Sequence, residues 1–272
     1  MSEQATEFDP KLKESVRTYW NKQSCGTDIA TSEKFSREYF EEIEEHRYAS
    51  EPEIMPFAQF TRWRGAKMLE VGVGAGSDFL QWVRAGTRAH GIDLTQEGID
   101  HVRERLGIYG LECEELRVGD AENIPFEDDS FDLVYSWGVI HHSPDTEKAL
   151  HEIARVVRPP GRGKLMVYNP KSAYVVYKYL RWGLLKGKPF MSIERIMAEH
   201  QESPGTKAYS IEEFTGMMKS AGFEIIMADA PVTIYDRLPD QPAPVRWVAY
   251  ILCFLAGLRT GGWFLRAEGI KT

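Results

Sequence analysis

Glycine and acidic residues gather around one short segment of this 272-residue chain, Lys67-Met-Leu-Glu-Val-Gly-Val-Gly-Ala-Gly76. Its apolar residues predict a short buried parallel strand. Glycines then stand at alternate positions, Gly72, Gly74 and Gly76, and Ser77 opens an apolar-periodic stretch that predicts a helix. Strand, glycine bend and helix form the first unit of a nucleotide-binding doubly wound sheet, because a bend without side chains lets the main chain approach a ligand.

The glycine spacing argues against a dinucleotide. A G-x-G-x-x-G pattern counted from Gly72 would place its third glycine at position 77, which is Ser77. Asp93 ends the next expected strand, 89–93, and follows Gly72 by 21 residues. That is close to the distance of about 20 at which an acid binds ribose hydroxyls, and a carboxylate can accept two hydrogen bonds side by side. Asp93 could instead cap the following helix, but Thr95 can fill that role.

Further strands are expected at residues 115–118, 131–137 and 164–168, with Asp120 just after the first of them. Ligands of open parallel sheets lie beyond the carboxyl ends of the strands. Residues 136–142 should therefore border the ligand. Ser143 and Pro144 predict the N-cap and first residue of the helix that follows.

These motifs together resemble the class I S-adenosylmethionine-dependent methyltransferases. The resemblance rests on Glu70-x-Gly72-x-Gly74-x-Gly76, Asp93, Asp120 and the run Asn123-Ile-Pro-Phe-Glu-Asp-Asp-Ser-Phe-Asp132, in that order, and spans about residues 66–169. The branch resembled is the small-molecule, type 11 branch, which includes ubiquinone and menaquinone methyltransferases. It implies an α/β, Rossmann-like seven-stranded sheet of order 3-2-1-4-5-7-6, flanked by helices, with the last strand antiparallel.

The resemblance also implies a single domain over residues 1–272. A helical lid is expected over 1–60, the cofactor-binding core over 61–169, an acceptor-side insertion after strand 5 over 170–210, and C-terminal strands with a helix over 211–272. The closing strands are expected at 223–229 and 262–268, separated by an apolar helix at 244–258.

S-adenosyl-L-methionine is the cofactor that the resemblance implies, with S-adenosyl-L-homocysteine as the product. Glu70 would anchor the amino group, Asp93 the ribose, and Asp120 with the Ala121 amide the adenine. Tyr19 and Trp20 are equally well explained as cofactor contacts or as packing of the lid. The residues expected to bind the cofactor are Tyr19, Trp20, Glu70, Gly72, Gly74, Gly76, Asp93, Leu94, Asp120, Ala121, Ser136 and Trp137.

The acceptor side is expected to hold a general base or an orienting hydrogen bond, if the acceptor must lose a proton. His141 suits that role, although a structural histidine at a helix start is an equal alternative. Arg47 and Tyr48 have the alternative of ending a helix, where a cation complements the dipole. The candidate catalytic residues are His141, His142 and Tyr209, and the candidate substrate contacts are Arg47, Tyr48, His141, His200, Lys207 and Tyr209.

No metal is expected, because neighbouring histidines do not share a face of a helix or strand and no third ligand stands at a standard spacing. The net charge of -8 argues against a nucleic-acid partner. The N-terminal residues MSEQATEFDP lack the features of a signal peptide, and three scattered cysteines suit a reducing compartment, so a cytoplasmic location is expected. The longest apolar run, 247–258, has 12 residues, short of the roughly 20 that span a bilayer.

Stable membrane insertion is therefore not expected. Residues 171–190 combine lysines and aromatic rings, which an ordinary amphipathic helix with snorkelling lysines explains best. The same stretch could also rest on a membrane surface, bind an anionic acceptor or form an oligomer contact. The oligomeric state stays open, with a homodimer as one option.

These observations leave three candidate functions. The first is methylation of an O, N or S atom of a small metabolite, thiols included, by in-line SN2 attack. The second is C-methylation of a quinone or lipid at a membrane surface, and the third is cofactor binding without catalysis.

Overall fold

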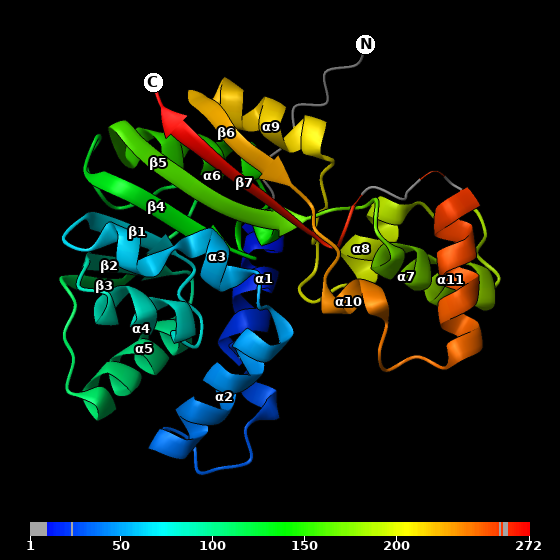
Figure 1. Cartoon of the computed structure of the whole chain (residues 1–272), viewed down its shortest axis with the longest axis horizontal. Helices are drawn as coiled ribbons and strands as arrows, with labels where there is room; N and C mark the ends of the chain where they lie inside the picture. The colour runs from blue at the N-terminus through cyan, green and yellow to red at the C-terminus, as the bar shows by residue number, and fades with distance from the viewer. Residues whose placement is uncertain (1–9, 23, 256, 258–260) are drawn as a thin grey trace.

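A computed structural model of the whole chain describes residues 10–22, 24–255, 257 and 261–272 (Figure 1). The leading residues on which the signal-peptide argument rests lie outside this described part. So do four positions, 256 and 258–260, that include the end of the expected apolar helix.

A seven-stranded sheet of order β3-β2-β1-β4-β5-β7-β6 forms the centre of the molecule and confirms the predicted topology. All neighbouring pairs up to β4–β5 are parallel, and β7 runs antiparallel to both β5 and β6. The strand order reverses between β1 and β4, which is where open sheets of this kind bind ligands. The strands are β1 (Lys67–Val71), β2 (Arg88–Asp93), β3 (Glu115–Val118), β4 (Phe131–Trp137), β5 (Val157–Tyr168), β6 (Phe223–Asp229) and β7 (Phe264–Lys271).

Helices cover both faces of the sheet because side chains along each strand alternate between them. On one face Met68 packs with Phe79 and Ile99, from α4 (Ser77–Arg84) and α5 (Gln96–Tyr109). On the other face Leu69 belongs to the cluster that α6 (Thr146–Val156) and α9 (Ile211–Ser220) complete. The double burial explains the near-continuous apolar run of β1.

Within the described residues, five helical elements precede β1: α1 (Pro10–Lys22), η1 (Thr27–Ile29), α2 (Arg37–Ser50), α3 (Ile54–Ala58) and η2 (Phe60–Trp63). Helices α1 and α2 lie beside the carboxyl ends of the strands, whereas α3 and η2 pack on the face of the sheet that carries Met68. A second group of helices gathers at one end of the molecule, beyond the carboxyl end of β5 (Figure 1). We call it the capping lobe: α7 (Ala173–Trp182), η4 (Leu184–Lys186), α8 (Ile193–His200), α10 (Ile234–Arg237) and α11 (Ala243–Leu255).

Several expected boundaries are wrong. Strand β5 starts at Val157 rather than residue 164. The segment Pro159-Pro160-Gly161 is part of this strand, and pairing with β4 begins at Val157. The helix predicted to start at Ser143 starts at Thr146, since the Asp145 side chain accepts from the Lys148 N–H and is the N-cap. Residues 140–142 form a separate 3-10 turn, η3. Strand β7 is shifted to 264–271, where it pairs with β5 along its length.

Candidate active site

A cavity of about 340 Å³ lies at the carboxyl ends of β1, β2 and β4. Its floor is the glycine bend after β1 together with the residues that follow β2 and β3. Helices α1 and α2 cover one side of it, and residues of the capping lobe close the opposite side. The cavity therefore has two halves, which we call the cofactor edge (the β1, β2 and β3 ends) and the acceptor wall (β4, β5, β7 and the capping lobe).

The glycine bend opens into the cavity at Gly74. Its φ is +51°, and a Cβ atom built there would meet nothing within 4 Å, so this main chain is free for close approach by a ligand. Gly72 is required for a different reason. A Cβ there would lie 2.3 Å from Cγ2 of Val139, so the missing side chain makes room for the protein's own packing.

Glu70 stands at the end of β1 with one carboxylate oxygen, Oε2, buried and without a hydrogen-bond partner among the described residues. The side chain lines the cavity and is only 4% exposed. Burial raises the pKa of Glu70 well above its usual range, and the nearby Asp78 carboxylate adds to that shift. A buried acceptor without a donor calls for a ligand donor, and a cationic amino group would restore the ionised form.

Asp93 is held rigidly at the end of β2. Its Oδ1 accepts from the Thr95 N–H at 2.9 Å and the Thr95 hydroxyl at 2.7 Å, and its Oδ2 accepts from the Gly74 N–H at 3.0 Å. Thr95 also caps α5, as the sequence predicts, by accepting from the Gly98 N–H. About four acceptor positions belong to a carboxylate, so Oδ2 keeps one for a ligand in the cavity.

Asp120 lines the cavity with Ala121 just after β3, but it has a partner that the sequence did not reveal. Lys13 of α1 donates to Asp120 Oδ2 at 2.6 Å and to Glu122 Oε2 at 2.5 Å. The lysine therefore joins the N-terminal helix to the expected adenine-binding end of the cavity. Opening α1 away from the sheet would break both ion pairs.

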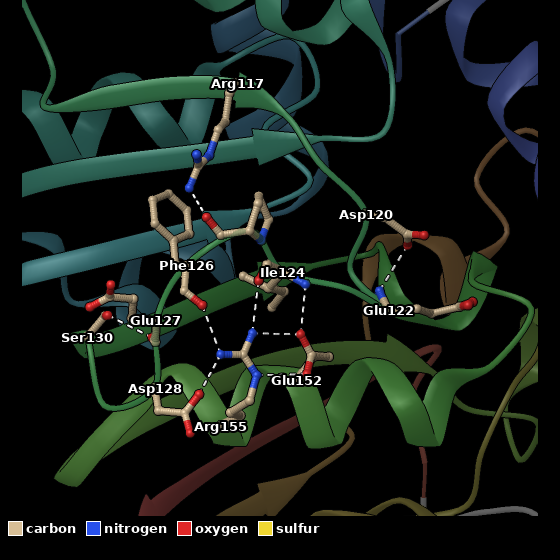
Figure 2. A network of polar contacts seen from close by, with 11 residues as sticks. Arg117, Asp120, Glu122, Ile124, Phe126, Glu127, Asp128, Ser130, Glu152 and Arg155 are labelled. Atoms are coloured by element: carbon tan, nitrogen blue, oxygen red, sulfur yellow. Dashed lines mark hydrogen bonds and ion pairs between the residues drawn. The ribbon is translucent and has the colours of Figure 1, made fainter.

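Arg155 of α6 fixes the segment that carries Asp120, as Figure 2 shows. Its guanidinium donates to the carbonyl oxygens of Ile124 and Phe126, both at 2.8 Å, and pairs with Glu152 and Asp128. Glu152 in turn accepts from the Ile124 N–H at 2.8 Å. The run 123–132 thus positions the site from outside: its residues form a turn tied to α6 rather than lining the cavity.

Arg47 of α2 lines the cavity and makes a bidentate ion pair with Asp78 of α4, at 3.1 and 2.8 Å. Asp78 is 2% exposed and also accepts from the Tyr48 and Tyr135 hydroxyls. Such fork-to-fork geometry holds the guanidinium in one orientation. The pair fastens the lid helix α2 to the start of α4 at the glycine bend.

Glu51, at the end of α2, reaches the acceptor wall and accepts from the Trp137 indole N–H at 2.5 Å. Burial raises the pKa of Glu51, although the nearby Arg47 cation opposes the shift.

Aromatic rings form most of the acceptor wall. Tyr168 stacks on Trp263 with a centroid distance of 4.1 Å, and Trp263 lies 4.8 Å from Tyr174 of α7. Met166 adds a flexible apolar side chain. The rings come from β4, β5, α7, α10 and the start of β7, and they are Trp137, Tyr168, Tyr174, Tyr235, Trp263 and Phe264.

Glu202 is the charged group of this wall that sequence reasoning missed. Its φ is +48°, an uncommon conformation for a residue with a side chain, and the strain points to a positional role. Its Oε2 accepts from the Tyr168 hydroxyl at 2.8 Å and lies 3.2 Å from Nε2 of His142. Burial by itself would raise the pKa of Glu202, but the neighbouring His142 imidazole and the hydrogen bond from the Tyr168 hydroxyl lower it.

His142 is brought to the cavity, between Glu202 and the loop that follows it. Its Nδ1 lies 2.9 Å from the Ser203 hydroxyl and 3.0 Å from that of Thr206, whose own proton goes to the Ser203 carbonyl. Two hydroxyls thus face Nδ1, and the Glu202 carboxylate lies nearest to Nε2. The Trp20 and His142 rings meet in a T-shaped arrangement with their centroids 5.2 Å apart.

Five candidates for the acceptor side do not line the cavity. His141 is fully buried with its ring 3.9 Å from that of Tyr168, and burial lowers its pKa well below the usual range. The Tyr209 hydroxyl donates to Thr146, Lys207 donates to the Ser143 carbonyl, the Tyr48 hydroxyl bonds to Asp78, and His200 stacks on Trp182. Each of these side chains is engaged in packing behind the cavity wall.

Two cofactor candidates also lie elsewhere. Tyr19 is 41% exposed and does not line the cavity that its neighbour Trp20 lines. Ser136 is fully buried and donates to the Val71 carbonyl, which ties β4 to β1. The remaining ten all line the cavity: Trp20, Glu70, Gly72, Gly74, Gly76, Asp93, Leu94, Asp120, Ala121 and Trp137.

The residues that sequence reasoning missed differ in how visible they were. Asp78 follows the glycine run directly, and an acid there could have been matched with the cation of Arg47. Lys13, Glu51 and Glu202 carry no such signal, because only the packing of distant segments brings them to the cavity. Within the described residues, no three His, Cys, Asp or Glu side chains gather as a metal site requires.

Residues 69–163 match the family model described as a methyltransferase domain. Among curated proteins, the uncharacterized methyltransferase YcgJ of Bacillus subtilis is 34% identical over 96 residues, which is 35% of this chain and 38% of that protein. Phthiotriol/phenolphthiotriol dimycocerosates methyltransferase 1 of Mycobacterium ulcerans is 38% identical over 183 residues, 65% of this chain and 59% of that protein. The matches thus cover less than two thirds of either relative.

Solved structures share the fold over nearly the whole chain. Geranyl diphosphate C-methyltransferase from Streptomyces coelicolor, solved with Mg²⁺, geranyl diphosphate and S-adenosyl-L-homocysteine, has a TM-score of 0.66 at 17% identity and covers 97% of this chain and 98% of its own. The PH0226 protein of Pyrococcus horikoshii has a TM-score of 0.58 at 18% identity, over 94% of this chain and 99% of its own.

The cofactor edge fits S-adenosylmethionine on its own geometry. Gly74 leaves room for a ligand against the main chain, Glu70 offers a buried acceptor for an amino group, and Asp93 keeps an acceptor position for a sugar hydroxyl. The sheet order, the matched domain and these residues agree: residues 69–163 are similar to methyltransferase domains, and the chain shares the fold of solved methyltransferases.

Proposed function

We propose that this protein transfers a methyl group from S-adenosylmethionine to an O, N or S atom of a small acceptor with an apolar or aromatic body. One observation carries the proposal. A single cavity has an unpartnered acid and an open glycine bend at the cofactor edge, and an ionised carboxylate, Glu202, among aromatic rings at the acceptor wall. Because each half of the cavity has its own acid, the cavity suits two ligands bound side by side, the cofactor at one half and the acceptor at the other.

When bound, the cofactor supplies an electrophilic methyl group on a sulfonium, open to in-line attack. The chain's contribution is mainly to position its two ligands, which can lower a barrier by roughly 7–11 kcal/mol in favourable cases. Gly74, Glu70 and Asp93 fix one ligand, and the rings around Tyr168 fix the other and keep water out. Lys13 and Arg47 hold α1 and α2 over the cavity while both ligands are bound.

Glu202 is the residue that we assign as proton acceptor. The carboxylate remains ionised at neutral pH because its pKa is lowered, and it lines the cavity with 29% of its side chain exposed. An acceptor hydroxyl, ammonium or thiol beside it would lose its proton to Oε1, which no described side chain occupies as a hydrogen-bond donor. His142 and Tyr168 keep the carboxylate in place by binding the other oxygen.

A second candidate is C-methylation of an apolar lipid or quinone. The aromatic wall would suit such a substrate, and the structural neighbour from Streptomyces coelicolor is named as a C-methyltransferase of geranyl diphosphate. The third candidate is binding of the cofactor without turnover.

The test is incubation of the purified chain with methyl-labelled S-adenosylmethionine and a cell extract separated into aqueous and lipid fractions, followed by mass spectrometry of labelled products. A water-soluble product labelled on O, N or S supports the proposal, and a carbon-labelled lipid supports the second candidate instead. Calorimetric binding of the cofactor with no labelled product in either fraction would leave only the non-catalytic function.

A further inference from the structure

Two segments of the capping lobe carry a charge opposite to that of the whole chain. Residues 171–191 and 241–255, which include α7, η4 and α11, contain six basic residues and no acid, whereas the full chain has a net charge of -8. The basic residues are Lys171, Lys178, Arg181, Lys186, Lys188 and Arg246. Such a segregation is a feature of a surface that meets an anionic partner.

The same lobe exposes a stripe of large apolar side chains along α11. Trp247, Val248, Ile251, Phe254 and Leu255 recur at helical spacing and are between 48% and 71% exposed. The opposite face of the helix is the buried one, because Ala249 and Cys253 pack against α7. A contiguous exposed stripe of this kind marks an interaction site, unlike apolar residues scattered singly over a surface.

A second apolar element follows α7 in the same lobe. Leu185 is 81% exposed and Phe190 is 98% exposed, and Lys186 and Lys188 stand between them on the surface. We call residues 184–190 and the outer face of α11 together the apolar-basic surface. Figure 1 places α11 and α7 at the end of the molecule away from β3.

We propose that the apolar-basic surface docks on an anionic lipid bilayer, with α11 lying in the plane of the membrane interface. Helix α11 has 13 residues, and no helix in the described part of the chain has both the length and the apolarity needed to cross a membrane. Aromatic and aliphatic side chains such as Trp247 and Phe190 enter the interface, while lysines attract anionic headgroups.

The charge of the apolar-basic surface favours an anionic bilayer over a second copy of the chain as its partner. A symmetric dimer through the apolar-basic surface would bring two sets of cations together with no acid from either set to offset them. An anionic bilayer supplies the missing negative charge. It also explains why the basic residues are concentrated here, since the rest of this acidic chain is repelled by such a membrane.

The docked orientation would set the cavity next to the membrane. Helix α7 carries Tyr174 on the acceptor wall and packs against α11 with Val176 and Tyr177, so one helix separates the cavity from the docking surface. This inference is independent of the proposed reaction, because it concerns a surface outside the cavity and its test requires no turnover.

The test is co-sedimentation of the full chain with vesicles of phosphatidylcholine alone or mixed with phosphatidylglycerol, at low and high salt. We expect binding to the mixed vesicles at low salt, with a loss of about tenfold or more in the Leu185→Ser/Phe190→Ser/Trp247→Ser variant and in the Lys186→Glu/Lys188→Glu variant. The matched control is Met55→Ser/Ile226→Ser, which removes exposed apolar side chains elsewhere and should bind like the unaltered chain.

Circular dichroism and cofactor affinity would verify that each variant remains folded. The proposal is overturned if the unaltered chain fails to sediment with the mixed vesicles, or if it binds both vesicle types equally at every salt concentration. A concentration-dependent dimer that the triple variant abolishes, seen by analytical ultracentrifugation without lipid, would assign the surface to a second copy instead.

Discussion

The two halves of the cavity are built by different means. The cofactor edge comes from residues 70–121 and works through backbone geometry: an open bend at Gly74 and two acids fixed at strand ends. The acceptor wall collects side chains from β4, β5, β7, α7, α10 and the loop after α8. The difference suggests that cofactor binding resists change because the main chain carries it, while the acceptor can change through single side chains.

The largest effect is expected from Gly74→Val. The new side chain would project into the space that the ligand needs and would strain a backbone with φ of +51°. Cofactor affinity, measured by calorimetry, should fall about 100-fold or more, equivalent to roughly 2.7 kcal/mol. Gly187→Val is the matched control, since Gly187 has a φ of +68° and equally open surroundings but lies outside the cavity. Equal losses in both variants would show that strain alone is responsible.

Glu202→Gln should damage turnover and leave cofactor binding intact, which would separate the two halves functionally. We expect kcat to fall about 100-fold with an acceptor that loses a proton. Because the pKa of Glu202 is lowered, activity should persist as pH falls and decline only when the carboxylate becomes protonated at acidic pH. The glutamine variant should lack that decline.

Glu199→Gln is the control for this change, because Glu199 belongs to the same lobe but pairs with Arg195 on the surface. A Glu202→Gln enzyme with unaltered kcat and pH profile would remove the carboxylate from the mechanism.

Glu70→Gln should weaken cofactor binding by about tenfold. Burial raises the pKa of the free Glu70 carboxyl, and a cationic amino group would lower it again. Binding should therefore release a proton and strengthen as pH rises. Calorimetry in buffers of different ionisation enthalpy measures that release. The proton release should disappear in the Glu70→Gln variant. If that variant releases as many protons as the unaltered chain, the titrating group is not Glu70.

The smallest effect is expected from Tyr235→Leu on the acceptor wall. Removal of one ring from the wall should raise the KM for the acceptor about three- to tenfold, while cofactor affinity stays constant. Tyr19→Leu is the control, since Tyr19 lies outside the cavity. A loss of cofactor affinity in the Tyr235 variant would show that the two halves are not independent.

The cofactor edge could be predicted because its signals are local. The bend after β1 and the acid at the end of β2 are separated by one helix and one strand, and each is marked by residue type alone. Helix caps were less certain: Ser143, Pro144 and Asp145 all suit a helix start, and only the hydrogen bond from the Lys148 N–H selects Asp145. His141 and His142 are neighbours with the same chemistry, yet the turn at 140–142 buries one and exposes the other to the cavity.

By itself, the sequence determined the position of the glycine bend and of the acids at or just after the ends of β1, β2 and β3, whereas the sheet order was implied by the family resemblance and confirmed by the structure. Strand and helix periods and glycine spacing are patterns of a few neighbouring residues, so the amino-acid sequence alone reveals them. Only the tertiary structure decided that Glu202, Glu51 and the rings of five separate elements share a wall, and that Lys13 closes over Asp120. The Tyr168–Glu202 hydrogen bond joins residues 34 positions apart, and the contacts of Trp137 with Glu51 and of Lys13 with Asp120 join residues 86 and 107 positions apart. Chain packing alone brings these residues together.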